Sequence, residues 1–251
     1  MEKQMEGKVA LVTGSGMGIG KVTALTFAWH GAKVVVGDIL EEKGKETVDQ
    51  IKKSGSDAIF VKCDVSKAAD IEKMIETAVN TYGKLDCAFN NAGVIVLSPT
   101  IDLTEKDWDH MIDIDLKGVW LCMKYEIRQM LKQGGGAIVN SASVAGYIGT
   151  PGMCAYTAAK HGVIGLTKTA ALEYVKCGIR VNAVCPGAIT TPMLQALTVD
   201  PSVEGTLLQM HPIGRFGKPE EIAEAVLWLC SDAASFCTGI AMPVDGGLLA
   251  Q

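Results

Sequence analysis

Short runs of β-branched and other apolar residues alternate with longer segments of helical period along almost the whole chain. This alternation is typical of parallel strands joined by right-handed helical crossovers. Strands are expected at 8–13, 32–38, 57–63, 85–93, 136–143, 179–187 and 240–244, and helices at 18–30, 41–54, 67–82, 104–132, 154–177 and 218–231. The pattern predicts an α/β fold with a doubly wound, seven-stranded parallel sheet that carries helices on both faces.

The chain is long enough to build one substantial core. It has 251 residues, of which 48% are hydrophobic and 20% are charged. No internal repeat or linker divides it, so residues 1–251 are expected to form a single domain. The stretch 188–217 lacks a strand pattern, and Pro192, Pro201 and Pro212 interrupt its leucines and methionines. We interpret it as a mobile substrate flap; a pair of surface helices packed on the core is the alternative, because apolar spacing does not separate the two.

Charge and hydropathy argue against nucleic acids and membranes as partners. The formal net charge is −5 and the 23 basic residues are spread thinly, whereas phosphate binding needs clustered Lys and Arg. The first residues carry charges up to Lys8 and then only a short apolar run, so neither a signal peptide nor a membrane-spanning helix is expected there. A cytoplasmic location is therefore predicted.

The cysteine and histidine positions predict neither disulfides nor a metal site. No two of the eight cysteines form a CxxC pair and most lie in apolar runs, so buried free thiols are expected, with oxidative pairing as the weaker alternative. The four histidines lie far apart and form no HExxH motif or His/Cys cluster, so no metal is expected.

A glycine-rich segment from Thr13 to Gly20 follows the first expected strand directly and opens the first expected helix. Gly14, Gly18 and Gly20 would let the backbone turn tightly, approach a pyrophosphate and seat the helix against the strand. The free N–H groups and the dipole at the helix start attract such an anion. A simple tight turn is the alternative, but the order of strand, glycines and helix favours a Rossmann-type dinucleotide site.

Asp38 ends the second expected strand, where a carboxylate meets the adenosine ribose in a dinucleotide-binding βαβ unit. A carboxylate accepts hydrogen bonds from both ribose hydroxyls but repels a 2′-phosphate. No arginine stands at 15–17 or at Ile39 to offset that repulsion, so NAD is favoured over NADP as the cofactor. The alternative role of Asp38 is that of a turn residue or N-cap before Glu41.

Tyr156 and Lys160 stand four residues apart within an expected helix, so both side chains project from one face. A free phenol is a poor base near neutral pH, but a neighbouring ammonium and the positive nicotinamide ring of NAD⁺ favour its phenolate form. An isolated pair at this spacing is more often a surface contact. Here Ser143 stands upstream, at the exit of the fifth expected strand, where parallel sheets place their sites.

These motifs occur with two more, the Asn90–Gly93 segment and Pro186-Gly187, and together they make the chain from Lys8 to Gly247 resemble the classical short-chain dehydrogenases/reductases. The resemblance implies an NAD(H)-dependent oxidoreductase that interconverts a secondary alcohol and a ketone, with a small molecule as its substrate. Taken alone, Pro186-Gly187 also fits a plain strand-ending turn. The motifs mark a superfamily and not a substrate.

The resemblance also assigns roles to individual residues. It implies that Ser143 hydrogen-bonds the substrate oxygen, that Tyr156 moves the proton, and that Lys160 holds the nicotinamide ribose. The glycines of the first turn would line the pyrophosphate, and the segment after the third strand would contact the adenine. The implied cofactor-binding residues are Gly14, Ser15, Met17, Gly18, Ile19, Gly20, Asp38, Ile39, Asp64, Val65, Asn91, Ala92, Gly93, Tyr156, Lys160, Pro186, Gly187, Ile189 and Thr191.

One position departs from the family pattern. The family usually has Asn near position 115, where it anchors a water that links the lysine to solvent, whereas register against Leu116 and Gly118 places Asp115 there. An ionised Asp accepts from a water or from Lys160 but cannot donate, and an added carboxylate favours the charged lysine. We therefore count Asp115 as a fourth catalytic residue in an altered proton relay; a tolerated helix residue is the alternative.

The expected substrate pocket is apolar, because hydrophobic residues flank the catalytic ones, namely Val144, Tyr147, Met153, Met193, Leu194 and Leu197. A cyclic, steroid-like or aromatic secondary alcohol is favoured over a sugar. A 3-oxoacyl thioester reductase of fatty-acid synthesis is the rival among enzymes, and Asp38 weakens it because such reductases typically use NADPH. A non-catalytic nucleotide-binding homologue is a further alternative, which the intact Ser143, Tyr156 and Lys160 disfavour.

The expected helix at 154–177 carries small residues on several faces, which permits close approach of another backbone. The family resemblance implies a homotetramer that uses this helix and the long one before it. Tight packing of the helix on its own sheet is the alternative.

Overall fold

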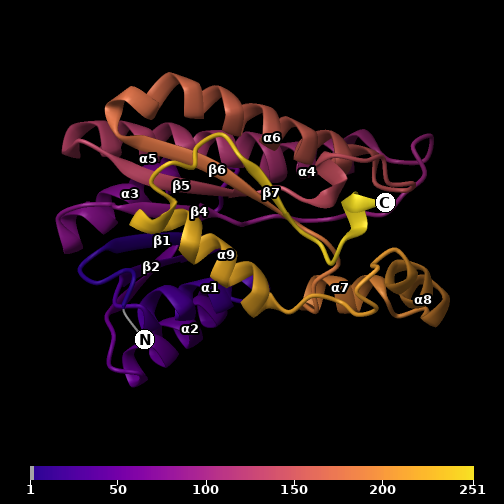
Figure 1. Ribbon diagram of the computed structural model, residues 1–251, viewed down its shortest axis with the longest axis horizontal. Helices are drawn as coiled ribbons and strands as arrows, with labels where there is room; N and C mark the ends of the chain where they lie inside the picture. Colours follow the sequence, from indigo (N-terminus) through magenta and orange to yellow (C-terminus); the bar gives the residue numbers. More distant parts are fainter. Residues whose placement is uncertain (1–2) are drawn as a thin grey trace.

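The computed structural model describes residues 3–251, and its centre is a sheet of seven parallel strands. Neighbouring strands follow the order β3-β2-β1-β4-β5-β6-β7. The strands are β1 (Val9–Thr13), β2 (Lys33–Asp38), β3 (Ala58–Lys62), β4 (Cys87–Asn90), β5 (Gly136–Ser141), β6 (Ile179–Pro186) and β7 (Ala241–Val244). The predicted doubly wound α/β fold is confirmed, and the strand order reverses between β1 and β4, where such sheets bind ligands at their carboxyl ends (Figure 1).

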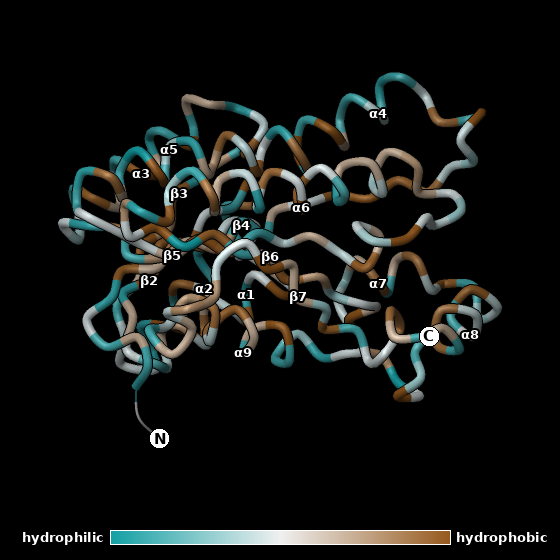
Figure 2. The backbone as a smooth tube through the Cα atoms, turned by 45° about the horizontal axis from the view of Figure 1, so that its top comes forward, coloured by the Kyte–Doolittle hydropathy of each residue, from teal (hydrophilic) through white to brown (hydrophobic). Residues whose placement is uncertain are grey.

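Helices cover both faces of the sheet (Figure 1). One face carries α1 (Gly18–Trp29), α2 (Glu41–Lys53) and α9 (Pro219–Cys230), and the other carries α3 (Ala68–Tyr82), α5 (Val119–Gln133) and α6 (Cys154–Tyr174). Phe27 and Ile222 lie in the core of the first face, and Ile71 and Met130 in that of the second. Strands buried on both faces are continuous apolar runs, which Figure 2 shows as brown segments between the helices.

The helix expected at 104–132 is interrupted. The structure has α4 (Glu105–Ile112), a π-helical segment at Asp113–Gly118, and then α5. A π turn closes i→i+5 hydrogen bonds and so changes which side chains face the core, and apolar periodicity does not reveal it. Such segments occur frequently at functional sites, and this one turns Asp115 fully inward.

The stretch 188–217 contains two short helices, α7 (Pro192–Leu197) and α8 (Pro201–Gln209). Thr191 caps the first and Asp200 the second, and a proline opens each, which is the favoured residue type at a first helical position. No residue of α8 is buried, and both helices lie beyond the carboxyl edge of the sheet (Figure 1). The two helices are thus present, while mobility of the flap stays a prediction.

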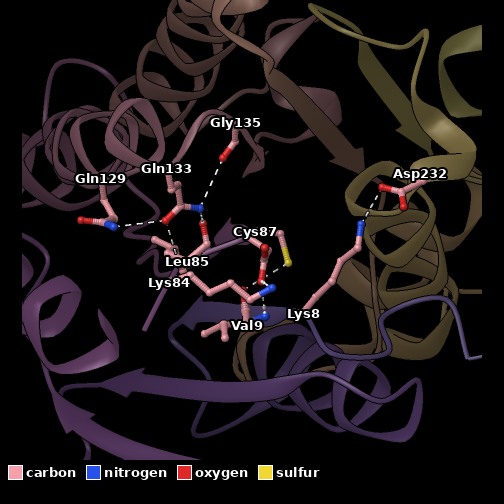
Figure 3. Close-up of polar contacts among 10 residues, drawn as sticks. Lys8, Val9, Lys84, Leu85, Cys87, Gln129, Gln133, Gly135 and Asp232 are labelled. Atoms are coloured by element: carbon pink, nitrogen blue, oxygen red, sulfur yellow. Dashed lines mark hydrogen bonds and ion pairs between the residues drawn. The ribbon is translucent and has the colours of Figure 1, made fainter. Parts of the chain in front are cut away.

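The amino edge of the sheet, where the strands begin, is held by side chains that bind the ends of neighbouring segments (Figure 3). Gln133, at the end of α5, accepts from the amide of Leu85 at 3.1 Å and donates to the carbonyl of Leu85 at 2.6 Å. Asp86 accepts from the amide of Val9 at 2.7 Å and pairs with Lys84 at 2.9 Å. The polar groups at this edge are therefore bonded to one another.

All eight cysteines are free thiols, and the expected burial holds for most of them but not for all. Five are buried, Cys154 and Cys237 are half-buried, and Cys177 is exposed. Residues 3–251 contain no helix that is long and apolar enough to cross a membrane. The same part of the chain contains no group of three or more His, Cys, Asp or Glu residues that could hold a metal ion.

Candidate active site

The glycine-rich turn between β1 and α1 has a backbone that other residues do not readily adopt. Gly14 and Gly18 have φ angles of 62° and 55°, in the left-handed region that favours glycine. At Gly20 an added Cβ would clash with the carbonyl oxygen of Gly14, so this glycine lets α1 pack against the turn. In the described part of the chain no side chain caps the start of α1, which leaves its first N–H groups available to an anion.

Asp38 is nearly buried at the end of β2, and both of its carboxylate oxygens accept a backbone hydrogen bond. Gly16 donates to one oxygen at 2.7 Å and Leu40 to the other at 2.8 Å. The bond from Leu40 is the turn contact that the alternative role predicted. Each oxygen has a further lone pair, so the fixed carboxylate can still accept from hydroxyls of a ligand.

A cavity, which we call the dinucleotide cavity, extends from this turn along the carboxyl ends of β2 and β4. Of the residues expected to bind a cofactor, it is lined by Gly14, Met17, Gly18, Ile19, Asp38, Ile39, Asp64, Val65, Asn91, Ala92, Gly93 and Thr191. Ser15 is not among them, because it is fully buried and its hydroxyl donates to the carbonyls of Val12 and Gly37. Asn91 is fixed here by donating to the carbonyls of Thr13 and Gly14.

Ser143, Tyr156 and Lys160 line a second cavity together with Asp115, Pro186, Gly187 and Ile189. We call it the substrate cavity. Ile19, Asn91, Gly93, Thr191 and Met193 line both cavities, so the two adjoin. Tyr156 and Lys160 come from successive turns of α6, and the Lys160 nitrogen lies 5.2 Å from the centre of the Tyr156 ring. The structure therefore gathers the candidate catalytic residues in one place.

Lys160 is held by two acceptors. Its ammonium donates to the carbonyl of Ser141 at 3.0 Å and lies 3.3 Å from Asp115. Burial lowers the pKa of Lys160, but the charges of Asp115 and Tyr156 outweigh burial, so that this pKa stands above its usual value. A lysine ammonium has three donors, so one remains for a ligand.

Asp115 lies at the centre of the π-helical segment and is fully buried. Both of its oxygens accept from the amide of Val94, at 3.3 and 3.2 Å. Burial raises the pKa of Asp115, while Lys160 and the Val94 amide oppose that rise. An added Cβ at Gly93 would lie 2.6 Å from the carboxylate, so the glycine makes room for it. The contact from Val94 has no signal in the sequence.

The substrate cavity is mostly apolar. Of the residues expected there, Val144, Met153, Met193, Leu194 and Leu197 line it, joined by Ile95, Ile148, Leu207, Met210 and Leu248. Tyr147 does not, because its hydroxyl donates to the carbonyl of Ala241 instead. The cavity measures about 210 Å³, and a cavity of ~150 Å³ in another protein admits benzene. A six-membered ring therefore fits.

Arg215 and His211 lie near the cavities and are both engaged in contacts within the protein. Arg215 forms a bidentate ion pair with Glu221, so its guanidinium is already paired within the protein. His211 lines the substrate cavity and is nearly buried, although no motif marked it. Its site depends on contacts with Ala188 and with α8, which are distant in the chain or specific to the folded structure, so the sequence alone did not indicate it.

The pattern of a family described as enoyl-(acyl carrier protein) reductase matches residues 14–249. Cyclohexanol dehydrogenase of Acinetobacter sp. (strain SE19) is 47% identical over 247 residues, which covers 98% of this chain and 96% of that protein. A 2,5-dichloro-2,5-cyclohexadiene-1,4-diol dehydrogenase of Sphingobium indicum is 44% identical over 98% of both chains. The 3-oxoacyl-[acyl-carrier-protein] reductase FabG of Thermotoga maritima is 43% identical and covers 98% of this chain and 99% of that one.

Solved structures that superpose on this chain are also named as reductases or dehydrogenases. Levodione reductase superposes with a TM-score of 0.95 at 36% identity, covering 98% of this chain and 99% of that one. A protein named as a 2-deoxy-d-gluconate 3-dehydrogenase, from Agrobacterium tumefaciens and with bound NADP, superposes with a TM-score of 0.91 at 36% identity and 99% coverage of both chains. The chain therefore belongs to the classical short-chain dehydrogenase/reductase family, whose members are nicotinamide-dependent oxidoreductases.

Proposed function

We propose that this protein interconverts an apolar cyclic secondary alcohol and its ketone with NAD(H) as cofactor. The observation that carries the proposal is the grouping of Ser143, Tyr156 and Lys160 in an apolar cavity that adjoins the dinucleotide cavity. The bound nicotinamide would accept or supply the hydride. The chain itself would supply position, hydrogen bonds and proton transfer.

Tyr156 is the proposed acid and base. In the oxidation direction its phenolate accepts the proton of the alcohol hydroxyl as the C–H hydrogen leaves as hydride; in the reduction direction its hydroxyl returns that proton to the carbonyl oxygen. The Lys160 ammonium lies 5.2 Å from the centre of the Tyr156 ring, close enough to stabilise negative charge that develops on the phenol oxygen during proton transfer. Ser143 already accepts from the amide of Ala145 at 3.1 Å, so its own proton stays available for the substrate oxygen.

The residues of the dinucleotide cavity fit a nicotinamide dinucleotide. The left-handed glycines and the uncapped start of α1 would hold the pyrophosphate, and Asp38 would accept from the adenosine ribose. The carboxylate is fixed by Gly16 and Leu40 and cannot swing away from a 2′-phosphate. These contacts support NAD over NADP, although one structural relative carries NADP.

Asp115 is the proposed fourth member of the catalytic group. Its contact with Lys160 supports a relay in which the carboxylate keeps the lysine charged and accepts a hydrogen bond from it or from a water. Asp115→Asn keeps an oxygen for the Val94 amide but removes the charge. We expect the pH–rate profile of this variant to shift. An unchanged profile would leave Asp115 a structural residue.

The form of the substrate cavity supports a ring-shaped, uncharged substrate. Apart from Lys160, no lysine or arginine lines it, and both ring nitrogens of His211 are bonded within the protein, so a carboxylate or phosphate on the substrate would lack a partner. Relatives named for cyclohexanol and cyclohexadiene-diol substrates agree with this class. The relative named FabG favours a second candidate, a 3-oxoacyl thioester reductase.

A substrate screen separates these candidates. The protein is incubated with a panel of cyclic, aromatic, open-chain and sugar alcohols and with NAD⁺ or NADP⁺, and absorbance of the reduced nicotinamide is followed. We expect the highest kcat/KM for an apolar cyclic alcohol with NAD⁺. A preference for an acetoacetyl thioester with NADPH would support the second candidate. Tight NADH binding without turnover of any substrate would support a non-catalytic role.

We also propose that residues 1–251 act as one domain, in the cytoplasm, within a homotetramer that uses α5 and α6. Part of the small-residue pattern on α6 serves packing within the chain, since an added Cβ at Gly162 would lie 2.7 Å from Leu116. Gly165 instead has no atom near its Cβ position, and Trp120 on α5 is 44% exposed, so both can face another subunit. Sedimentation equilibrium tests this assembly, and a monomer would contradict it.

A further inference from the structure

We propose that His211 is a positioning residue that joins the end of helix α8 to the loop 186–191, which we call the cofactor loop. This inference rests on the proposed function, because it assigns the cofactor loop to the nicotinamide end of the dinucleotide. The structure places His211 between the two segments as their shared hydrogen-bond partner. Its loss is therefore expected to disturb both cofactor and substrate binding.

The hydrogen bonds of His211 define one tautomer. The amide of Ala188, in the cofactor loop, donates to the Nε2 atom at 2.9 Å. The Nδ1 atom lies 2.8 Å from the carbonyl oxygen of Leu207, in α8. A neutral imidazole has one acceptor nitrogen and one N–H. Because a backbone amide only donates, Nε2 is the acceptor and Nδ1 carries the proton.

The imidazole ring of His211 is closely enclosed by its neighbours. His211 is only 4% exposed, and an added Cβ at Gly187 would lie 2.6 Å from Nε2. The Phe216 ring packs against the imidazole nearly at a right angle, with 6.2 Å between the ring centres. On its other side the cofactor loop is fixed, since the carbonyl of Ala188 accepts from the amide of Gly217 at 2.9 Å. A smaller side chain at 211 would leave a hole and an unpaired amide.

The position of His211 gives this link a function. No residue of α8 is buried, so the helix has little apolar surface of its own to hold it against the sheet edge. Leu207 and Met210, from this segment, line the substrate cavity, while Gly187 and Ile189 line it from the cofactor loop. Both ring nitrogens are already bonded within the protein, so His211 does not bind substrate oxygen. It acts through the segments that it joins.

Two substitutions separate the two hydrogen bonds. The side-chain oxygen of glutamine reaches the position of Nε2, so His211→Gln keeps an acceptor for Ala188 and loses the bond to Leu207. The side-chain NH₂ of asparagine takes the position of Nδ1, so His211→Asn keeps the bond to Leu207 and leaves the Ala188 amide without an acceptor. Each variant is compared with the natural protein by hydrogen–deuterium exchange, NADH titration and steady-state kinetics.

The two variants are expected to fail differently. In His211→Asn the amide of Ala188 exchanges on the order of tenfold faster and NADH binding weakens by a similar factor, because an unbonded amide loses its protection. In His211→Gln the amide of Ala188 stays protected, while the peptide 201–210 exchanges faster and KM for the alcohol rises with kcat largely kept. His161→Asn is the matched control, since exposed His161 makes the same contact to a carbonyl four residues before it but joins no second segment.

The proposal is overturned if both variants match the natural protein in exchange, NADH affinity and KM, or if both change all three quantities alike. The second outcome would show a general packing role. Exchange of the Ala188 amide and of peptide 201–210 needs no turnover. A protein that oxidises no alcohol would therefore defeat the proposed function while the exchange data still decide the role of His211.

Discussion

The two edges of the central sheet use their polar groups in opposite ways. At the amino edge, Gln133 binds both backbone groups of Leu85, and Asp86 binds the amide of Val9, so side chains close the ends of strands (Figure 3). At the carboxyl edge, Ser143 keeps a free proton, and the Tyr156 hydroxyl takes part in no hydrogen bond within residues 3–251. Groups left open beside a cavity are available to a ligand, whereas bonded groups stabilise the fold.

A third region lies between the edges and resembles neither. Glu126 of α5 is fully buried and accepts from the Asn90 side chain at 3.0 Å, and Asn90 in turn donates to Asn140 at 3.0 Å. One oxygen of Glu126 and the side-chain oxygen of Asn90 have no hydrogen-bond partner among residues 3–251. This network links β4, β5 and α5. The buried polar groups of Glu126, Asn90 and Asn140 therefore neither close the end of a strand nor lie open to a ligand.

The largest effect on activity is expected from removing the open hydroxyl of Tyr156 at the carboxyl edge. Tyr156→Phe removes the hydroxyl that would move the proton, and we expect kcat to fall by on the order of 10²–10⁴-fold with NADH affinity kept. Tyr174→Phe is the matched control, because Tyr174 ends the same helix at the opposite edge. Steady-state kinetics and NADH titration measure both variants. A Tyr156→Phe protein that keeps most of its kcat would remove Tyr156 from the mechanism.

Features set by short segments of the chain could be predicted from the sequence, whereas contacts between distant segments could not. The strands, the helices around them and the glycine-rich turn follow from local pattern, since apolar period and positive φ are properties of short segments. Asp115 could be placed only by register, and its π-helical backbone left no trace in the periodicity. Tyr147 was expected in the pocket but bonds to Ala241 on β7, a contact made by a distant segment.

His211 and Glu126 are two further residues whose surroundings the sequence did not predict. Each is buried because segments far apart in the chain enclose it, α8 and the cofactor loop for His211, and β4 and α5 for Glu126. A lone histidine or glutamate in a sequence carries no sign of such an enclosure. Sequence motifs thus identify groups that a family keeps open for ligands, but not the partners that hold them in place.

The second effect concerns the region between the edges. Burial raises the pKa of Glu126 from 4.5 to about 8. The folded state therefore holds this proton more tightly than the unfolded state, and the stability contributed by protonated Glu126 is complete below pH 4.5 and is lost as pH rises to about 8. Glu126→Gln stays neutral at every pH and keeps a side-chain oxygen that can accept the bond from Asn90.

We expect the free energy of unfolding of Glu126→Gln to exceed that of the natural protein by on the order of a few kcal/mol at pH 8, with a much smaller difference at pH 5. Urea unfolding at both pH values measures it. If the difference does not depend on pH, Glu126 does not hold a proton in the folded state. A large loss of kcat in this variant would place the network with the carboxyl edge.

A smaller effect is expected at Asp38, where the carboxyl edge meets the cofactor. Replacing Asp38 by Ala and Ile39 by Arg removes the ribose acceptor and adds a cation for a 2′-phosphate. A hydrogen bond to a charged group contributes about 1.5–3 kcal/mol, so the ratio of kcat/KM for NAD⁺ and NADP⁺ should move towards NADP⁺ by roughly 10- to 100-fold. Equal use of both cofactors by the natural protein would contradict the role of Asp38.

The smallest effect is expected at the amino edge, where Gln133 contributes to stability and not to activity. Gln133→Ala leaves the buried Leu85 without its bonds at 3.1 and 2.6 Å, and we expect the free energy of unfolding to fall by about 1 kcal/mol, because water can replace part of what is lost. Gln129→Ala is the matched control, since Gln129 only donates to Gln133 on the exposed surface. Urea unfolding measures both variants, and kcat should stay unchanged in each. If Gln133→Ala lowered kcat at unchanged stability, the two edges would be coupled, and the division between a structural and a functional edge would fail.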